Sequence, residues 1–295
     1  MSTALARITG LALLALLSLA CQAATPRCAV DALAQRLCLE APAGRVVSLS
    51  PGATELLFSA GAGDAVVAVS AWSDYPPEAA RLPQVGDSQR LDLEAIVALA
   101  PELVVAWTDG NARTQLDRLA ALGVPVFWLA PRDFDDIAGA VEALGHLTGH
   151  DALAARRAAA FRAAIDELRV RYREARPVRV FYQVWDQPLM TVNGDELISK
   201  AIALCGGRNV FADSPRLVPR VTVESVLAAD PEAIVTAGRG DGGWLARWRR
   251  FPELTAVARD NLFLMTPSLL QRPTLRVAAG SHELCQRLEQ ARGRL

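Results

Sequence analysis

The 295-residue chain has few of the residues that build common nucleotide and metal sites. Lys200 is the only lysine, and it is not part of a GxxxxGK[ST] phosphate loop, so that motif is excluded. Histidine occurs only at positions 146, 150 and 282, too sparsely for a histidine-rich zinc site. The 31 Lys and Arg residues do not exceed the 32 Asp and Glu residues, which argues against a nucleic-acid-binding protein. We therefore expect no nucleic-acid partner, no metal and no resident cofactor.

Motifs of catalytic sites are also missing. There is no GxSxG, no HExxH and no GxGxxG after the first expected strand. Asp74, Asp109 and Glu55 could act as carboxylate catalysts, for example in a hydrolase, but no spacing pairs them as acid and base, and loop carboxylates more often cap turns. His146 and His150 are four residues apart, yet a partly exposed helix end explains them more simply. These observations predict a binding protein and not an enzyme.

The only long apolar run lies at the N-terminus. Arg7 precedes the apolar stretch 8–20, whose length suits a secretory signal peptide and is too short to span a bilayer. Cys21 follows Leu-Ser-Leu-Ala, which is similar to a bacterial lipoprotein box, while ordinary signal peptidase could cut just beyond it. We expect residues 1–24 to be a signal peptide and the mature chain to be exported, either soluble or lipid-anchored through Cys21.

Four cysteines remain when Cys21 is set aside, an even number that suits an oxidising compartment. Cys28 and Cys38 are close enough in sequence to staple a hairpin, and Cys205 and Cys285 could close a loop in the C-terminal third. Their spacings resemble no zinc site, so disulfides are the favoured interpretation.

Short β-branched runs alternate with helical patterns after residue 44. The runs lie at 45–49, 65–69, 103–106 and 124–128, with helical patterns at 53–60, 92–99 and 113–122, and a second series of runs follows at 178–182, 233–236 and 262–265. Continuous apolar strands of this length are typical of parallel sheets covered on both faces. The sequence therefore predicts an α/β fold with two doubly wound parallel-sheet lobes.

A long helix is expected between the two series. Residues 151–175 are rich in Ala, Arg, Leu and Glu and contain neither Pro nor Gly, which favours one stiff helix that Pro177 ends. A flexible linker would repeat Gly, Ser or Pro. After the signal peptide, the expected units are a hairpin (25–44), an N-terminal lobe (45–148), a rigid bridging helix (149–176) and a C-terminal lobe (177–295).

The two lobes share an internal repeat. Residues 93–105 match residues 223–235, and in each copy a glutamate precedes a proline by seven positions. Glu94 and Glu224 thus occupy the same place in both lobes, in the first turn of a short helix, where the helix dipole favours a carboxylate. This matched pair of exposed acids could contact a receptor that has two basic pockets.

Tryptophans gather at the expected carboxyl ends of the strands, where parallel α/β sheets bind ligands. Trp72, Trp107 and Trp185 fall at such ends. Aromatic side chains beside a few polar groups favour a cleft for a large, flat, partly apolar ligand. Ordinary packing of loop aromatics is the alternative at each position.

The sequence resembles the periplasmic cobalamin-binding proteins that serve ABC importers. The resemblance rests on Val-Ser-Leu-Ser-Pro at 47–51, Thr-Glu-Leu at 54–56, Ser-Asp-Tyr-Pro-Pro at 73–77 and the stretch 93–107. It extends over most of the mature chain. It implies two lobes that close little on binding, capture of cobalamin or a related corrinoid, and delivery to a membrane permease dimer. We expect the protein to act as a monomer.

The resemblance also implies roles for individual residues. Glu94 and Glu224 would dock onto arginines of the two membrane subunits, and Cys205 and Cys285 would form the family's disulfide. Trp72 stands at the place of a corrin-contacting tyrosine, Trp107 and Arg272 match cleft residues, and Trp185 lies close to a cleft aromatic. With the backbone of the preceding loop, the expected ligand-binding residues are Ser50, Pro51, Gly52, Ala53, Trp72, Trp107, Trp185 and Arg272.

The sequence departs from the family at three cleft positions. Two tryptophans and an aspartate are replaced at about Ser88, Val218 and Ser268. A haem or ferric-siderophore carrier of the same architecture is therefore the alternative, with Tyr75 or Tyr182 as the residue that would contact haem iron. A periplasmic hydrolase that uses Asp74 or Asp109 is the second alternative, and a purely structural lipoprotein is the third.

Overall fold

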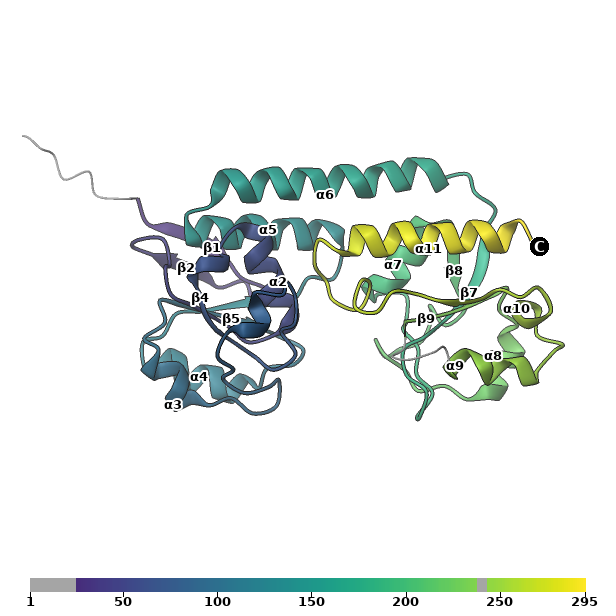
Figure 1. Ribbon diagram of the computed structural model, residues 1–295, viewed down its shortest axis with the longest axis horizontal. Helices are drawn as coiled ribbons and strands as arrows, with labels where there is room; N and C mark the ends of the chain where they lie inside the picture. The colour runs from purple at the N-terminus through teal and green to yellow at the C-terminus, as the bar shows by residue number, and fades with distance from the viewer. Residues whose placement is uncertain (1–24, 238–242) are drawn as a thin grey trace, which may run out of the picture.

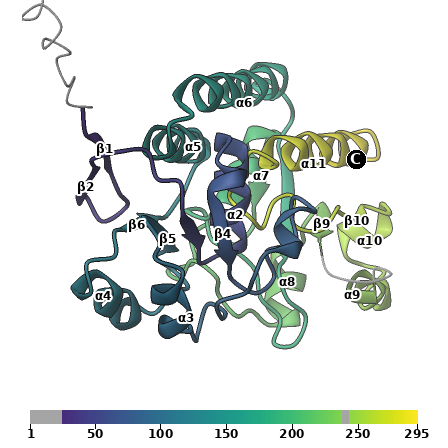
Figure 2. The same ribbon diagram turned by 60° about the vertical axis from the view of Figure 1, so that its left-hand side comes forward.

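Two parallel four-stranded sheets form two lobes that stand side by side beneath a long helix (Figure 1). The structure, a computed structural model, describes residues 25–237 and 243–295. The α/β class and the two lobes predicted from the sequence are confirmed. Both views place the long helix on the same side of the two sheets (Figure 2).

The N-terminal lobe has the strand order β4-β3-β5-β6. Its strands are β3 (Val46–Ser48), β4 (Val66–Val69), β5 (Leu103–Trp107) and β6 (Val126–Leu129). Helices α2 (Pro51–Ala60) and α5 (Phe134–Thr148) cover one face, and α3 (Leu93–Ala98) and α4 (Arg113–Ala121) cover the other. Short 3-10 turns lie at Gly63–Ala65 and Ala79–Arg81. All the strands are therefore buried on both faces, which explains why they read as continuous apolar runs.

The C-terminal lobe repeats this plan with the order β10-β9-β7-β8. Its strands are β7 (Val178–Gln183), β8 (Gly207–Asn209), β9 (Ala233–Thr236) and β10 (Leu262–Leu264). Helices α7 (Leu197–Leu204) and α11 (Val277–Arg292) cover one face, and α8 (Val223–Ala229), α9 (Gly243–Ala246), the turn Trp248–Arg250 and α10 (Thr255–Ala258) cover the other. The sequence did not predict β8, because this edge strand reads Gly-Arg-Asn and has no apolar run.

The bridging helix α6 (Asp151–Tyr172) has one apolar stripe. Its buried residues follow one another at intervals of three or four, which places them on one face: Ala154, Ala158, Phe161, Ile165, Leu168 and Tyr172. The stripe belongs to a single hydrophobic cluster that also contains residues of α2 and α5 in one lobe and of α7 and α11 in the other. A continuous core therefore joins the lobes, and α6 ends three residues before the last residue predicted for it.

Both predicted disulfides are present. Cys28 and Cys38 face each other across an antiparallel hairpin, and Cys205 at the end of α7 is bonded to Cys285 in α11. The hairpin strands are β1 (Arg27–Val30) and β2 (Arg36–Leu39). The hairpin is attached to the first lobe through the Ala32 N–H, which donates to the Trp128 carbonyl at 2.9 Å.

Within residues 25–237 and 243–295, no helix has both the length and the apolar character needed to cross a bilayer. The predicted signal peptide, with Cys21, lies outside the described residues.

The continuous core predicts a strong effect of truncation in α6. Phe161 is 4% exposed, so Phe161→Ala should lower the free energy of unfolding by about 3–5 kcal/mol, because the neighbouring side chains cannot move far enough to fill the cavity left by the ring. Val170 on the same helix is 76% exposed, so Val170→Ala should change the free energy of unfolding by less than about 0.5 kcal/mol. Urea unfolding followed by circular dichroism should show one transition. Equal effects of the two substitutions, or separate transitions for the two lobes, would contradict a shared core.

Candidate functional site

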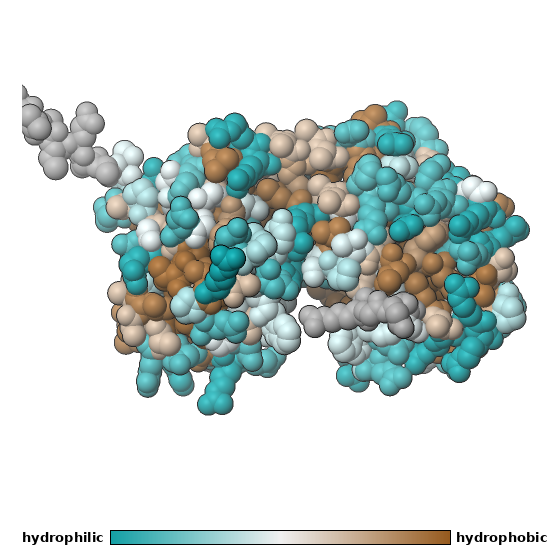
Figure 3. Space-filling view, viewed as in Figure 1, coloured by the Kyte–Doolittle hydropathy of each residue, from teal (hydrophilic) through white to brown (hydrophobic). Residues whose placement is uncertain are grey.

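A recess of about 200 Å³ lies at the carboxyl ends of the N-terminal strands. It is formed by Ser50, Pro51, Gly52, Ala53, Leu56, Trp107, Leu129, Pro131, Gln271, Arg272 and Pro273. Six of the eight predicted ligand-binding residues thus lie together, including Arg272 from the C-terminal part of the chain. The space-filling view shows the surface hollowed between the lower parts of the two lobes (Figure 3).

The start of α2 shapes one wall of the recess. Ser50 caps the helix, since its hydroxyl accepts from the Ala53 N–H at 3.1 Å, and Pro51 occupies the first helical turn. The buried Thr54 hydroxyl oxygen lies 3.1 Å from both the Ser50 carbonyl oxygen and the Ser73 hydroxyl oxygen, and its single proton can be donated to either of them. This network fixes the loop after β4 against the helix.

Trp72 sits on that loop and is 66% exposed. Its backbone φ is +68°, an uncommon value for a bulky residue that persists only where surrounding contacts impose it. The side chain is not among those that line the recess. The fold thus presents Trp72 at the surface beside the site.

Trp107 ends β5 and is half-buried in the recess wall. Its backbone N–H donates to the Asn111 side-chain oxygen at 2.8 Å, and the Asn111 amide donates to the Leu49 carbonyl at 3.0 Å. The ring lies directly over Gly110, where a Cβ atom would be 2.3 Å from it. Glycine at position 110 is therefore what allows Trp107 its orientation.

Trp185 lies in the other lobe and is 54% exposed. Its ring packs edge to face against Trp244 of α9, with centroids 5.7 Å apart, and its indole N–H donates to the Gln187 carbonyl at 3.1 Å. It does not line the recess. Sequence reasoning placed Trp185 at a strand end but missed its pairing with Trp244, which comes from a different strand end.

Among the described residues that line the recess, Arg272 is the only charged one. One of its terminal nitrogens donates to Glu55 at 2.8 Å and to Asp74 at 2.6 Å. The hydrogen bond from Arg272 holds the pKa of Asp74 below its ordinary value. Glu55 is buried and is also bound by Thr274 and Arg276, so neither carboxylate is an unengaged catalytic acid or base.

Glu94 and Glu224 are both exposed, in the first turns of α3 and α8. Asp92 and Thr222 cap these helices. Hydrogen bonds from its own backbone and from the Thr222 side chain lower the pKa of Glu224. In both ribbon views α3 and α8 lie along the edge of the molecule opposite α6 (Figures 1 and 2), so the two acids belong to the same side.

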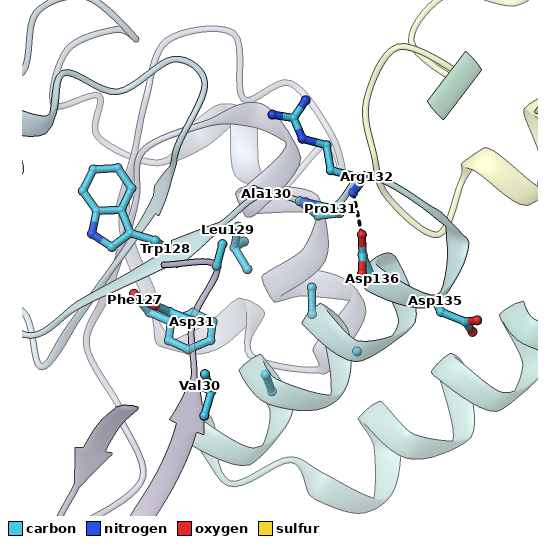
Figure 4. A pocket seen from close by; sticks show the side chains of 14 residues that line it. Val30, Asp31, Phe127, Trp128, Leu129, Ala130, Pro131, Arg132, Asp135 and Asp136 are labelled. Carbon is cyan, nitrogen blue, oxygen red and sulfur yellow. Dashed lines mark hydrogen bonds between the residues drawn. The ribbon is translucent and has the colours of Figure 1, made fainter. Parts of the chain in front are cut away.

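A larger hollow of about 720 Å³ lies elsewhere in the first lobe, between the hairpin, β6 and α5 (Figure 4). None of the predicted ligand-binding residues lines it. Asp136 in its wall accepts from the Arg132 backbone N–H at 2.9 Å and helps to cap α5, which gives that carboxylate a structural role.

The tyrosines and histidines considered for haem or metal contact are buried or contact other side chains. Tyr182 is fully buried, and burial raises the pKa of its hydroxyl. Tyr75 packs against Arg276, whose guanidinium carbon lies 3.9 Å from the centroid of the Tyr75 ring. His146 bonds to Asp151 at 2.7 Å. Within the described ranges no group of three or more His, Cys, Asp or Glu side chains could hold a metal ion.

Residues 46–269 match the family described as periplasmic binding protein. The chain belongs to this family. It is 40% identical over 266 residues to a vitamin B12-binding protein of Yersinia pseudotuberculosis, covering 89% of this chain and 93% of that one. A vitamin B12-binding protein of Vibrio cholerae is 36% identical over 250 residues, covering 84% and 90%.

Solved structures agree with this membership. The periplasmic vitamin B12-binding protein BtuF of Vibrio cholerae superposes with a TM-score of 0.79 at 36% identity, over 85% of this chain and 98% of that one. The periplasmic haem-binding protein RhuT from Roseiflexus sp. RS-1 gives a TM-score of 0.75 at 25% identity, over 84% and 98%. Family members are periplasmic binding proteins, and the present chain is one of them rather than an enzyme.

The contact between Gly110 and Trp107 can be tested with two alanine substitutions. Gly110→Ala should push the Trp107 ring aside, changing the near-ultraviolet circular dichroism and lowering the free energy of unfolding by about 1–3 kcal/mol. Gly139→Ala in α5 is the matched control, because nothing lies within 4 Å of its added Cβ, and it should stabilise the helix by about 0.5–1 kcal/mol. An unchanged aromatic spectrum in the Gly110 variant would show that the ring does not depend on this glycine.

Proposed function

We propose that this protein captures cobalamin or a related corrinoid in the periplasm and delivers it to an inner-membrane ABC importer. The observation that carries the proposal is the recess, in which Trp107 and Arg272 come together beside the exposed Trp72. The 36–40% identity to proteins named for vitamin B12 supports the choice of ligand.

The recess would hold one edge of the ligand. Its volume of about 200 Å³ is below the roughly 300–1,000 Å³ of sites that enclose a drug-sized molecule. Trp72 and Trp185, exposed on different lobes, offer flat apolar surfaces for the rest of the ring system. Arg272 would donate hydrogen bonds to the polar side groups at the ligand's rim.

Binding would need little movement of the lobes. The core that runs through α6 is continuous, and Glu55 on α2 holds the segment containing Arg272, Thr274 and Arg276. A stiff receptor does not release its ligand spontaneously by opening. We infer that the importer grips Glu94 and Glu224, one on each lobe, and separates the lobes to release the ligand.

Of the two tyrosines that a haem carrier could use as iron ligands, only Tyr75 reaches the surface. Tyr182 is buried within the second lobe, and Tyr75 is covered on one face by Arg276. The corrinoid needs no such ligand from the protein, because stacking and hydrogen bonds to its rim suffice.

The mature protein would act as a monomer in the periplasm, soluble or anchored through Cys21. The mass of the natural N-terminal peptide separates the two cases, because a lipidated Cys21 adds acyl chains. Sedimentation of the delipidated or soluble protein, with and without cyanocobalamin, reports whether it stays a monomer.

Substitutions in the recess should weaken ligand binding. Trp107→Ala and Arg272→Gln should each reduce cyanocobalamin affinity by roughly 10–100-fold, since a buried aromatic contact or a charge-assisted hydrogen bond is lost. Arg173→Gln is the control, because this exposed arginine pairs only with its neighbour Glu174 at 3.1 Å. Calorimetric titration measures the affinities, and thermal unfolding checks that each variant is folded. Wild-type affinity in both recess variants would refute the assigned site.

The docking role can be separated from binding by charge reversal. Glu94→Arg combined with Glu224→Arg should abolish uptake through the importer while leaving cyanocobalamin affinity within about twofold, because both side chains lie away from the recess. Glu167→Arg with Glu174→Arg makes the same change of charge around α6, on the opposite side, and should retain uptake. Transport by the doubly reversed Glu94 and Glu224 variant at the wild-type rate would contradict docking.

A further inference from the structure

Arg272 belongs to a cluster in which positive and negative groups are equal in number. Two guanidinium groups, Arg272 and Arg276, face two carboxylates, Glu55 and Asp74. The Glu55 oxygens accept from Arg272 and from both Nε and Nη2 of Arg276 at 2.8–2.9 Å, and from the Thr274 hydroxyl at 3.0 Å. The cluster therefore carries hydrogen-bond donors but no net charge.

The two carboxylates are placed differently. The Glu55 side chain is 1% exposed and fully engaged, so it holds Arg272 permanently. The Asp74 side chain is 61% exposed and approaches Arg272 from the solvent side at 2.6 Å. An exposed aspartate is ionised at neutral pH, and the hydrogen bond from Arg272 lowers the pKa of Asp74 further. Its negative charge therefore stands where a ligand's polar edge would arrive.

Arg272 still has donors to offer. Its hydrogen bonds to Glu55, Asp74 and the Trp72 carbonyl at 3.3 Å use three of the five N–H groups of a guanidinium. A neutral carboxamide oxygen could accept from the remaining donors without meeting a net charge. A carboxylate would lose its hydration and gain no net cation in return, with Asp74 close by to repel it.

Resting on the corrinoid function proposed above, we propose that Asp74 is a specificity-determining residue that makes Arg272 select neutral carboxamides over carboxylates. Cobalamin carries carboxamides around its rim, whereas haem and many siderophores present carboxylates. The charge balance set by Asp74 thus separates ligands that could otherwise occupy the same fold.

The test uses ligands that differ by one charge. Cyanocobalamin is compared with its monocarboxylate derivatives, in each of which one rim carboxamide is replaced by a carboxylate of nearly the same shape. The wild-type protein should bind at least one derivative about tenfold more weakly than cyanocobalamin at low salt. The ratio of the derivative's dissociation constant to that of cyanocobalamin should shrink in about 0.5 M salt, where exposed charges are screened.

Asp74→Asn removes the charge and keeps the shape and an acceptor for Arg272. It should reduce the discrimination against that derivative, measured as the ratio of the derivative's dissociation constant to that of cyanocobalamin for the same variant, to about threefold or less. Asp117→Asn is the matched control, because it neutralises an exposed aspartate paired with Arg113 at 3.0 Å on α4, outside the recess. This control should keep the wild-type ratio.

The outcomes separate the two proposals. Cyanocobalamin binding with no discrimination against any derivative, or with equal discrimination by wild type and the Asp74 variant, overturns the role of Asp74 and leaves the corrinoid function standing. Absence of cyanocobalamin binding by the wild-type protein overturns the function itself, and the inference with it. The salt dependence of the wild-type ratio needs no variant: a ratio that does not change with salt overturns an electrostatic role of Asp74 even if the Asp74 variant folds poorly.

Discussion

The buried carboxylate of Glu55 is the contact on which the geometry of the site depends. It lies on α2 of the N-terminal lobe and binds Arg272, Thr274 and Arg276, which precede α11 of the C-terminal lobe. A buried carboxylate is stable only when its oxygens are fully hydrogen-bonded, and removing a partner would leave a costly uncompensated charge. The lobes are therefore tied at the edge of the cleft as well as through the core of α6, and the position of Arg272 in the recess follows from this tie.

The molecule combines a stiff frame with exposed aromatic side chains. The frame consists of two sheets, a shared core and a disulfide between α7 and α11. Trp72 and Trp185 project from strand ends on opposite lobes and remain largely exposed. Such an arrangement suits a ligand that supplies its own rigid shape, because the receptor does not have to fold around it.

The sequence predicted the parts of this structure that are local or repeated. The composition of residues 151–175 indicated α6, and the internal repeat placed Glu94 and Glu224 in equivalent turns. The sequence could not reveal the role of Glu55. The partners of Glu55 lie more than 200 residues away along the chain, and a carboxylate in the first two turns of a helix is expected to be solvent-exposed. The edge strand β8 was missed since three polar or small residues carry no apolar signal, and the packing of Trp185 on Trp244 depends on tertiary structure.

The most direct test of the account is a calorimetric titration of the mature, disulfide-intact protein with cyanocobalamin, with haemin and a ferric siderophore as parallel ligands. The account predicts saturable one-to-one binding of cyanocobalamin and no comparable binding of the other two. Binding of haemin or of the siderophore by a protein that gives no response to cyanocobalamin would contradict it.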